Sequence, residues 1–473
     1  MLPDGKFSWR DRADAAAWWL SGGLLGPVWR FVAAIGITTG PWLLAIAALG
    51  LIGRGLQPVL PNGAIQDLNL SITYAFCLAS LIAGPVGTIT ARAVRSAVEE
   101  RDGAQVYELF VVATVTVGVT AQILATGLCF GLGLGPLGLS IAQVFLSVAT
   151  AMLWVSFSVV AVLRSYRFMI GAFAAGMVLS VVSAVLTVRL HATAEVAIWS
   201  FATGLFLCSA LCLAHVGRSF GQQTQRIKDA AQQSLRQFRA NRHLALAVFV
   251  AVCAVWADKW MFWFGPVGMR SLAGFAHFEP YDSVTFLAQL SIIPTFATMF
   301  LLNETEIARG VADFRRSIRE HATFAVIREA VGNLGQLVWT RFFRIGFIQA
   351  TVTAILALAA PFLANALHFS AQQLALLPIA LISVFLQSIA YLACAVLILC
   401  NRTRTFLWVQ LFFLVTNVLC SITSYLIVGV SVYGLFVSSA LFATVSAITA
   451  FRALGGYDYL VYLGENDSLY SRK

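Results

Sequence analysis

Charged side chains are scarce in this chain. They make up 11% of its 473 residues, whereas apolar and aromatic residues make up 59%. An ordinary soluble domain has about 25% charged residues. The composition therefore excludes a soluble fold of this size and predicts a protein that crosses a membrane several times.

Signatures of enzymes, metal sites and disulfides are also lacking. The sequence contains no P-loop, GxSxG, HExxH or dinucleotide-binding fingerprint, and its six histidines are scattered. Its eight cysteines fall inside apolar runs, without a CxxC pair or a Cys/His cluster. We therefore expect no enzymatic activity, no cofactor, no metal and no disulfide. The thiols are interpreted as small buried apolar groups.

What the sequence has instead is a series of twelve apolar runs, each long enough to span the hydrocarbon core as a helix of about 20 residues. A polar, basic stretch divides them into six plus six. This pattern predicts an all-α polytopic membrane protein with about twelve transmembrane helices in two six-helix bundles. The runs fall near 31–53, 68–90, 106–130, 137–163, 168–189, 194–217, 244–265, 281–302, 339–366, 372–399, 405–428 and 431–452.

The predicted organisation is an N-terminal bundle at 1–217, a basic amphipathic linker at 218–243, a C-terminal bundle at 244–452 and a cytoplasmic tail at 453–473. The C-terminal bundle includes a second cytoplasmic amphipathic segment, at 303–338. An even number of spans in each half means that both halves enter the membrane from the same side. If the halves are structural repeats, they are parallel repeats related by an axis along the membrane normal.

Basic residues set the expected orientation, because segments rich in Lys and Arg stay on the cytoplasmic side. With the N-terminus inside, 27 Lys and Arg residues fall in the predicted inner segments and three in the outer ones, Arg54, Arg189 and Arg270. We therefore expect a multi-pass protein of the bacterial inner membrane with both termini in the cytoplasm. Topology and attraction to anionic membrane lipid explain the formal charge of +10, without nucleic acid.

Two inner segments are predicted to form amphipathic helices at the membrane surface. In 218–243 the apolar residues Ile227, Ala231, Leu235 and Phe238 share one face. The second segment, 303–338, has a similar stripe of Phe324, Ile327, Val331 and Leu334. Either segment can be a connector lying on lipid or a docking surface for a cytoplasmic partner.

The sharpest local feature is a pair of charges, Asp258 and Lys259, inside the seventh predicted span. A charged residue costs about 2.5–3.5 kcal/mol at the bilayer centre. Asp258 lies about 21 Å along the span at 1.5 Å per residue, in its outer half. A role in a transport cavity and a structural role, by snorkelling or cross-helix pairing, both stay open. Neighbours at i and i+1 diverge by about 100° on a helix, so the two are not expected to form a close local pair.

Three tryptophans on this span, Trp256, Trp260 and Trp263, share one helical face. Aromatic faces stack on sugar rings, but tryptophan also packs in cores and in interfacial belts. A platform for sugars is therefore one of two interpretations, and an ordinary belt or core is the other.

Prolines and amides give weaker signals. Pro41, Pro85 and Pro294 lie within the first, second and eighth spans. Proline kinks a helix, and such kinks suit helices that open and close a transport path. Uncharged amides at membrane depth can line a wet path or form hydrogen bonds between helices. These amides are Gln143, Gln289, Gln349, Gln387 and Asn417.

Several motifs together have a familiar pattern. With them, the chain resembles the membrane exporters of the Pel exopolysaccharide system (PelG-like), in the multidrug/oligosaccharidyl-lipid/polysaccharide (MOP) flippase superfamily. The motifs are Asp258-Lys259-Trp260 with FWFGP at 262–266, Tyr281-Asp282 with FLA at 286–288 and IIP at 292–294, Glu304-Thr305-Glu306, and TGPW at 39–42.

The resemblance implies a twelve-helix fold of two six-helix bundles around a central cavity, through which a galactosamine-type polysaccharide is exported. It also implies that a cytoplasmic glycosyltransferase makes the polymer from UDP-sugar. A cyclic-di-GMP-sensing membrane subunit is implied as a further partner. Polysaccharide, membrane lipid and these two proteins are thus the expected partners.

A transport path follows as a hypothesis. Trp260 and Trp263 are expected to stack on sugar rings. Asp258 and Lys259 are expected to hydrogen-bond hydroxyl groups or to lock the bundles together. The remaining candidates lie at the two ends of the path: Tyr281 and Asp282 at the outer mouth, and Glu304 and Glu306 at the inner end of the eighth span, where they contact the polymer or pair with Arg309 or Arg315.

Three rival functions stay open. An ion-coupled small-molecule antiporter of the same superfamily fold needs an acidic residue deep in a bundle, and Asp258 is the plausible one. A membrane glycosyltransferase usually has acidic or Arg-rich outer loops, whereas the outer loops here are short and poor in charge. A non-transporting scaffold of a synthase complex needs neither feature.

Overall fold

The computed structural model describes a helical membrane protein. Because the hydrocarbon core offers no water to backbone groups, helices that satisfy their own hydrogen bonds are the expected solution. Eleven helices among the described residues are long and apolar enough to cross a membrane, and Leu43–Gly55 is a shorter apolar helix. The described residues are 31, 34–56, 60, 62–100, 102–188, 193–221, 227–302, 310 and 324–455.

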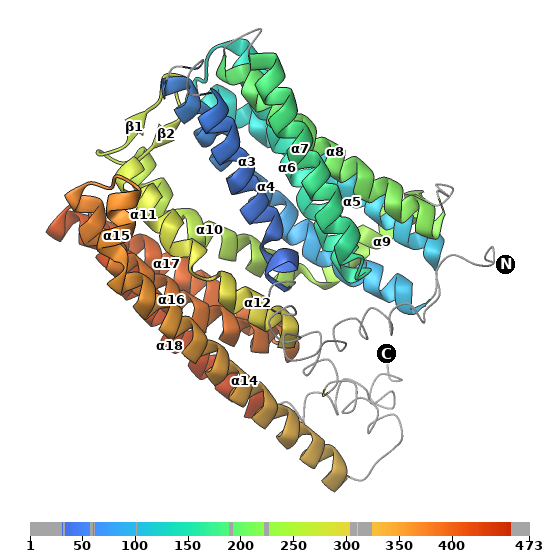
Figure 1. The fold of residues 1–473 in the computed structure, drawn as a ribbon. Coiled ribbons are helices and arrows are strands. Elements are labelled where there is room, and N and C mark those ends of the chain that lie inside the picture. The colour runs from blue at the N-terminus through green and yellow to red at the C-terminus, as the bar shows by residue number, and fades with distance from the viewer. Residues whose placement is uncertain are drawn as a thin grey trace, which may run out of the picture. The chain divides into compact units, whose positions relative to one another are not determined.

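The first of two compact units includes Thr39–Trp256 and Phe262–Phe278. Figure 1 shows its long helices, which run from blue to green. Its helices are α3 (Gly40–Leu56), α4 (Asn62–Glu99), α5 (Gly103–Leu132), α6 (Leu137–Val162), α7 (Tyr166–Val188), α8 (Ala194–Phe220), α9 (Ile227–Ala240) and most of α10 (Arg242–Phe264).

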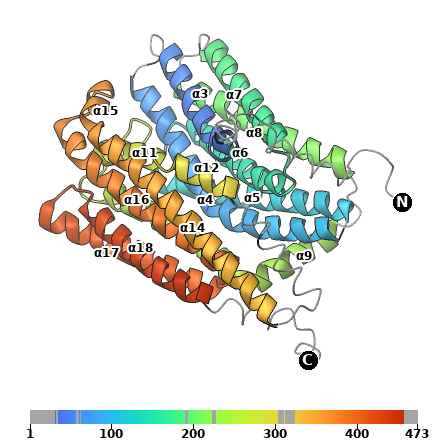
Figure 2. The same cartoon turned by 60° about the horizontal axis from the view of Figure 1, so that its bottom comes forward.

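The second unit includes Ala257–Met261 of α10 and the chain from Glu279 onward. Figure 2 shows the long helices α14, α16, α17 and α18 of this unit. Its further helices are α11 (Glu279–Leu290), α12 (Ile293–Leu302), α14 (Phe324–Leu358), α15 (Ala360–Ala366), α16 (Ala371–Leu399), α17 (Thr403–Val428) and α18 (Tyr433–Gly455).

The predicted fold class is confirmed: about twelve transmembrane helices form two bundles, and nearly every described residue is helical. The compact units do not divide at the predicted linker, however, because most of α10 is grouped with the first unit. The predicted boundaries at 217 and 244 describe the order of the spans along the chain, whereas the units follow packing.

The two units repeat the same helix pairings. In the first unit, α4 packs on α6, α6 on α8 and α7 on α8. In the second, α11 packs on α16, α16 on α18 and α17 on α18. When the spans are numbered from one to six within each half, both halves pair the second span with the fourth, the fourth with the sixth and the fifth with the sixth. The pattern supports the parallel repeat that the sequence suggested only by counting.

The ninth span differs from its prediction. A helix beginning near 339 was expected, preceded by a separate surface helix, but α14 runs without interruption from Phe324 to Leu358. At 1.5 Å per residue its 35 residues extend about 52 Å, far more than the hydrocarbon core needs. Leu334 of the predicted stripe is buried, at 3% exposed. The described part of the 303–338 segment is therefore an extension of the span.

A short hairpin, which was not predicted, follows α10. Strand β1 (Met269–Arg270) pairs antiparallel with β2 (Ala276–His277). The hydroxyl of Tyr74 on α4 donates to the Ala276 carbonyl at 2.7 Å, and the carboxylate of Asp67 accepts from the amide of Ala273 at 3.3 Å. These bonds fix the hairpin on the first unit.

Helices α7 and α8 approach each other unusually closely. A Cβ atom added to Gly204 on α8 would meet the hydroxyl of Ser180 and the carbonyl of Gly176 on α7, and one added to Gly176 would meet the Gly204 carbonyl. Small residues permit such backbone contact between membrane helices, where van der Waals packing drives association. The two glycines therefore set the distance between these helices.

We expect Gly204→Ala to lower the thermal stability of the detergent-solubilised chain, because overpacking of this kind costs about 1–3 kcal/mol. Gly171→Ala is the matched control on α7, since its added Cβ has no atom within 4 Å. It is expected to be neutral or slightly stabilising. Thermal unfolding followed by size-exclusion chromatography measures both. An unchanged melting temperature for Gly204→Ala would contradict the close-contact argument.

Candidate functional site

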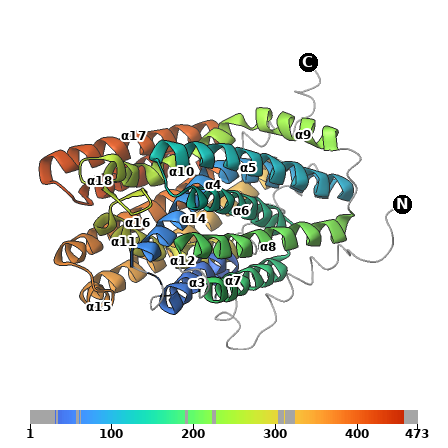
Figure 3. The same cartoon turned by 90° about the horizontal axis from the view of Figure 1, so that it is seen from above.

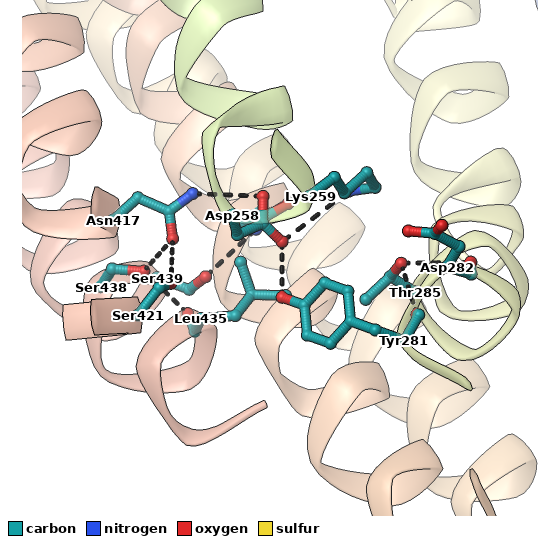
Figure 4. Close-up of polar contacts among 11 residues, drawn as sticks. Asp258, Lys259, Tyr281, Asp282, Thr285, Asn417, Ser421, Leu435, Ser438 and Ser439 are labelled. Atoms are coloured by element: carbon teal, nitrogen blue, oxygen red, sulfur yellow. Dashed lines mark hydrogen bonds and ion pairs between the residues drawn. The ribbon is translucent and has the colours of Figure 1, made fainter. Parts of the chain in front are cut away.

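The Asp258 carboxylate is the centre of a buried polar network in the second unit. Its side chain is 0% exposed, and that of Lys259 is only slightly exposed. Figure 4 shows three donors around it. The Tyr281 hydroxyl donates to Oδ2 at 2.5 Å, the Asn417 amide donates to Oδ1 at 3.4 Å, and the Lys259 ammonium lies 3.8 Å from Oδ2. The charge is thus matched on both oxygens.

Asn417 extends the network from α17 to α18. Its amide oxygen accepts hydrogen bonds from Ser438 at 3.1 Å and from Ser421 at 3.5 Å. The amide nitrogen is thereby left to face Asp258, which fixes the orientation of the amide group. The name "Asp258 cluster" denotes Asp258, Lys259, Tyr281, Asn417, Ser421 and Ser438 (Figure 4).

The pairing of Asp258 with Lys259 was not expected from the sequence. Their Cβ directions diverge on the helix, but the flexible four-carbon stem of lysine lets its ammonium return to the neighbouring carboxylate. At 3.8 Å the pair has the distance of a loose ion pair. The two residues thus meet only loosely, and the shorter bond of Asp258 is the one to Tyr281.

Tyr281 and Asp282 lie in the first turn of α11, yet their environments differ. Tyr281 is 1% exposed, and its hydroxyl points to Asp258. Asp282 is half-buried, and its backbone carbonyl accepts a hydrogen bond from Thr285 at 3.2 Å. The proposed place of both residues at an outer mouth stays a prediction, but the Tyr281 side chain faces the Asp258 cluster and leaves little surface for a ligand.

The tryptophans of α10 are not equivalent. Trp263 is 3% exposed and stacks on Tyr74 of α4, with ring centroids 4.9 Å apart. Trp256 meets Trp263 edge-on at 6.0 Å, so these two do share a face. Trp256 and Trp260 are half-buried. Since one face of Trp263 is covered by Tyr74, the other two tryptophans offer more surface to a sugar.

The eighth predicted span is broken beside Pro294. Helix α11 ends at Leu290 and α12 begins at Ile293, so proline is its second residue. Gln349 of α14 bridges the break, since its amide nitrogen donates to the Ser291 carbonyl at 3.0 Å and its oxygen accepts from the Thr295 hydroxyl at 2.7 Å. An apolar pocket of about 320 Å³ lies there, lined by residues that include Leu287, Pro294, Val352, Leu363 and Leu381.

The other proposed kinks and the acidic residues lie as follows. Pro85 is inside the continuous helix α4, and Pro41 is the second residue of α3, directly after a turn at Thr39. Glu304 and Glu306 lie outside the described residues. Their proposed contact with the polymer or with arginine therefore stays a prediction.

Most of the membrane-depth amides form hydrogen bonds between helices. Gln143 of α6 donates to the Ser71 carbonyl of α4 at 3.2 Å, and Gln387 of α16 donates to Ser439 of α18 at 3.1 Å. Gln349 and Asn417 also link helices, as described above. Of the two interpretations of these amides, the contacts favour the structural one for all four.

The Asp258 cluster surrounds a carboxylate with hydrogen-bond donors. Each partner of the carboxylate is an N–H or O–H donor, whereas a hard cation such as Na⁺ or Ca²⁺ requires several oxygen ligands. Among the described residues no group of three or more His, Cys, Asp or Glu side chains is placed to hold a metal. The cluster therefore fits a role in positioning α10, α11 and α17.

Sequence comparison identifies one family. The family model described as "PelG: Putative exopolysaccharide Exporter (EPS-E)" matches residues 21–462. No curated protein matches the chain in sequence.

Solved structures share the fold at low sequence identity. A mutant of the MATE transporter VcmN of Vibrio cholerae aligns over 98% of this chain and 100% of its own, with a TM-score of 0.64 and 14% identity. A MOP superfamily transporter from Pyrococcus furiosus aligns over 93% of this chain and 98% of its own, with a TM-score of 0.56 and 15% identity. The fold is thus that of the MOP transporters.

We expect Asp258→Asn and Tyr281→Phe to destabilise the chain non-additively, because either change removes the same short, charge-assisted bond. Couplings in membrane proteins average about 0.6 kcal/mol and reach about 1.7, and this pair is expected near the upper value. Unfolding free energies from titration with SDS measure the cycle. A control cycle of Asp258→Asn with Tyr433→Phe should be additive, since Tyr433 is 48% exposed. Additivity in both cycles would contradict a stabilising hydrogen bond between Tyr281 and Asp258.

Proposed function

Because the chain belongs to the PelG family of exopolysaccharide exporters, we propose that it exports a Pel-type, galactosamine-rich polysaccharide across the bacterial inner membrane. The observation that carries the proposal is the match of the family model to residues 21–462, nearly the whole chain. The MOP fold agrees with it, since that fold serves membrane transport. The chain is a membrane transporter of the MOP type, and its substrate is the proposed part.

The residues of α10 and Tyr281 of α11 are proposed to have two different roles. The half-buried Trp256 and Trp260 contact the polymer, since aromatic faces stack on the apolar faces of sugar rings. Asp258 and Tyr281 act as positioning residues, because their functional groups are turned to each other and buried. This assignment modifies the hypothesis in which Asp258 itself binds sugar hydroxyl groups.

The proposed surroundings follow from the family and from the charges. Both termini are proposed to lie in the cytoplasm, because 27 basic residues fall in the predicted inner segments and three in the outer ones. A cytoplasmic glycosyltransferase delivers the polymer, and a cyclic-di-GMP-sensing membrane subunit controls the complex. The path between two helical bundles is part of the same proposal.

A second candidate is an ion-coupled small-molecule antiporter, which the fold of the MATE transporters favours. The donors around Asp258 argue against a cation site in this conformation, because both carboxylate oxygens already accept hydrogen bonds. Dye efflux from vesicles driven by a proton or sodium gradient, with Asp258→Asn abolishing it, would favour this candidate over polysaccharide export.

Deleting this chain from its host is expected to abolish secretion of hexosamine polymer while the glycosyltransferase still uses UDP-sugar. Re-expressing the wild type should restore secretion. Secreted and intracellular hexosamine, measured separately, give the answer. Normal secretion without this chain would contradict the export function.

Trp260→Ala is expected to lower secretion several-fold at an unchanged protein level and melting temperature. A stacked pair of aromatic rings contributes about 0.5–1.5 kcal/mol, and we expect a similar contribution from a sugar ring stacked on Trp260. Trp408→Ala is the matched control, because Trp408 is 70% exposed on α17. Asp258→Ala and Lys259→Ala are expected to lower secretion together with stability. If both leave secretion intact at normal protein level, the site assignment fails.

A further inference from the structure

Helix α9 has an apolar stripe that the described residues leave uncovered. Leu235 is 51% exposed and Phe238 is 41% exposed, and Ala231 is exposed as well. With 3.6 residues per turn, these residues and the half-buried Ile227 occupy about 80° of the helix circumference. An apolar stripe of this kind on a short polar helix is typical of a helix that lies in a membrane interface.

A different side of α9 is fixed to the first unit. Ala230 is 2% exposed, and the side-chain oxygen of Gln233 accepts a hydrogen bond from Gln105 of α5 at 2.7 Å. At the end of the helix, Asn241 accepts from the guanidinium of Arg92 on α4 at 2.9 Å. Figure 3 shows α9 beside α5, and the two helices pack together. Helix α9 thus has a defined packed face, which leaves the apolar stripe facing outward.

The membrane surface is the nearest candidate to cover the stripe. Only Asn241 separates the end of α9 at Ala240 from the start of α10 at Arg242, and α10 is apolar and long enough to be a span. The end of α9 therefore lies one residue from the membrane. A partner that covers the stripe has to occupy the same interface.

The basic residues specify the kind of lipid. Lys228 and Arg239 follow the edge of the stripe at about 20° and 40° beyond Leu235 on a helical projection. Arg242 begins the span, and all three side chains are exposed. None of them forms an ion pair with a described residue. Lysine and arginine beside an apolar stripe can snorkel to lipid phosphates.

We propose that α9 binds the surface of anionic phospholipid on the cytoplasmic side, with Ala231, Leu235 and Phe238 inserted among the acyl chains and Lys228, Arg239 and Arg242 on the phosphates. Each basic residue near such a surface contributes about 1 kcal/mol, which corresponds to about fivefold in affinity. The helix then anchors α4, α5 and the start of α10 to the inner leaflet. This proposal does not depend on what the protein transports.

The test uses the full chain in lipid nanodiscs with a nitroxide label at one of two positions. Leu235→Cys places the label on the stripe, and Gln232→Cys places it on an exposed position beyond the basic edge. Oxygen is concentrated in the bilayer and a nickel chelate in water, so their relative effect on the label reports depth. The unsubstituted chain, whose described cysteines are buried or half-buried, gives the labelling background.

With phosphatidylglycerol in the nanodisc, the label at 235 is expected to be several-fold more accessible to oxygen, relative to the nickel chelate, than the label at 232. Pure phosphatidylcholine should reduce this difference. Lys228→Glu with Arg239→Glu should reduce it in phosphatidylglycerol as well, and Arg236→Glu, on the far side of the helix, should reduce it less. Hydrogen–deuterium exchange of residues 227–240 in the unsubstituted chain should be slower in phosphatidylglycerol.

Three results would overturn the proposal. Equal water accessibility at 235 and 232 in phosphatidylglycerol would mean that the stripe does not enter the bilayer, as expected of a surface for a cytoplasmic protein. Equal depth at 235 in both lipids would exclude recognition of the net negative charge of the lipid. Identical exchange of 227–240 in both lipids would do the same without any substitution.

Discussion

The Asp258 carboxylate has no exposed surface, and much of the second unit is arranged to satisfy it. A buried charge is tolerated only when it is paired and hydrogen-bonded, since an isolated one would cost many kcal/mol. Here α10 supplies the acid and the lysine, α11 supplies the tyrosine, and α17 supplies the amide. The serines on α17 and α18 then orient the amide. The network around this one carboxyl group thereby joins four helices.

This constraint also explains why a transporter can carry a charge at membrane depth without exposing it to the substrate. Breaking a buried pair by removing one partner is strongly destabilising, whereas keeping the pair adds little stability over apolar packing. Such a group therefore favours one arrangement of helices over its alternatives. The half-buried Trp256 and Trp260 on the same helix are the residues that we propose for contact with a polymer.

Much of the fold was predictable because hydropathy depends only on local sequence. The span predicted at 194–217 became α8 (Ala194–Phe220), and that at 372–399 became α16 (Ala371–Leu399). The bond from Asn417 to Asp258 joins residues 159 positions apart, and no local pattern encodes it. The presence of both residues in apolar spans marked each one singly as unusual, but not the two as partners.

The two errors in the predicted fold, at α14 and at the β1–β2 hairpin, also have physical causes. The uninterrupted helix α14 was divided in the prediction because its first part is polar, although a helix continues through polar sequence when its backbone bonds are unbroken. The hairpin β1–β2 was missed because its bonds to Tyr74 and Asp67 come from a distant helix. The loop length alone gave no hint of strands.

The same hairpin has a consequence for biogenesis. The first unit contains Phe262–Phe278, which the ribosome makes only after the linker at 218–243. When the sixth span has been synthesised, Tyr74 still lacks its partners in β2 and Trp263, and Asp67 still lacks the backbone amide of Ala273. Assembly of the N-terminal bundle thus has to wait for a segment of the second half, and a chain divided in the linker would yield two incomplete fragments.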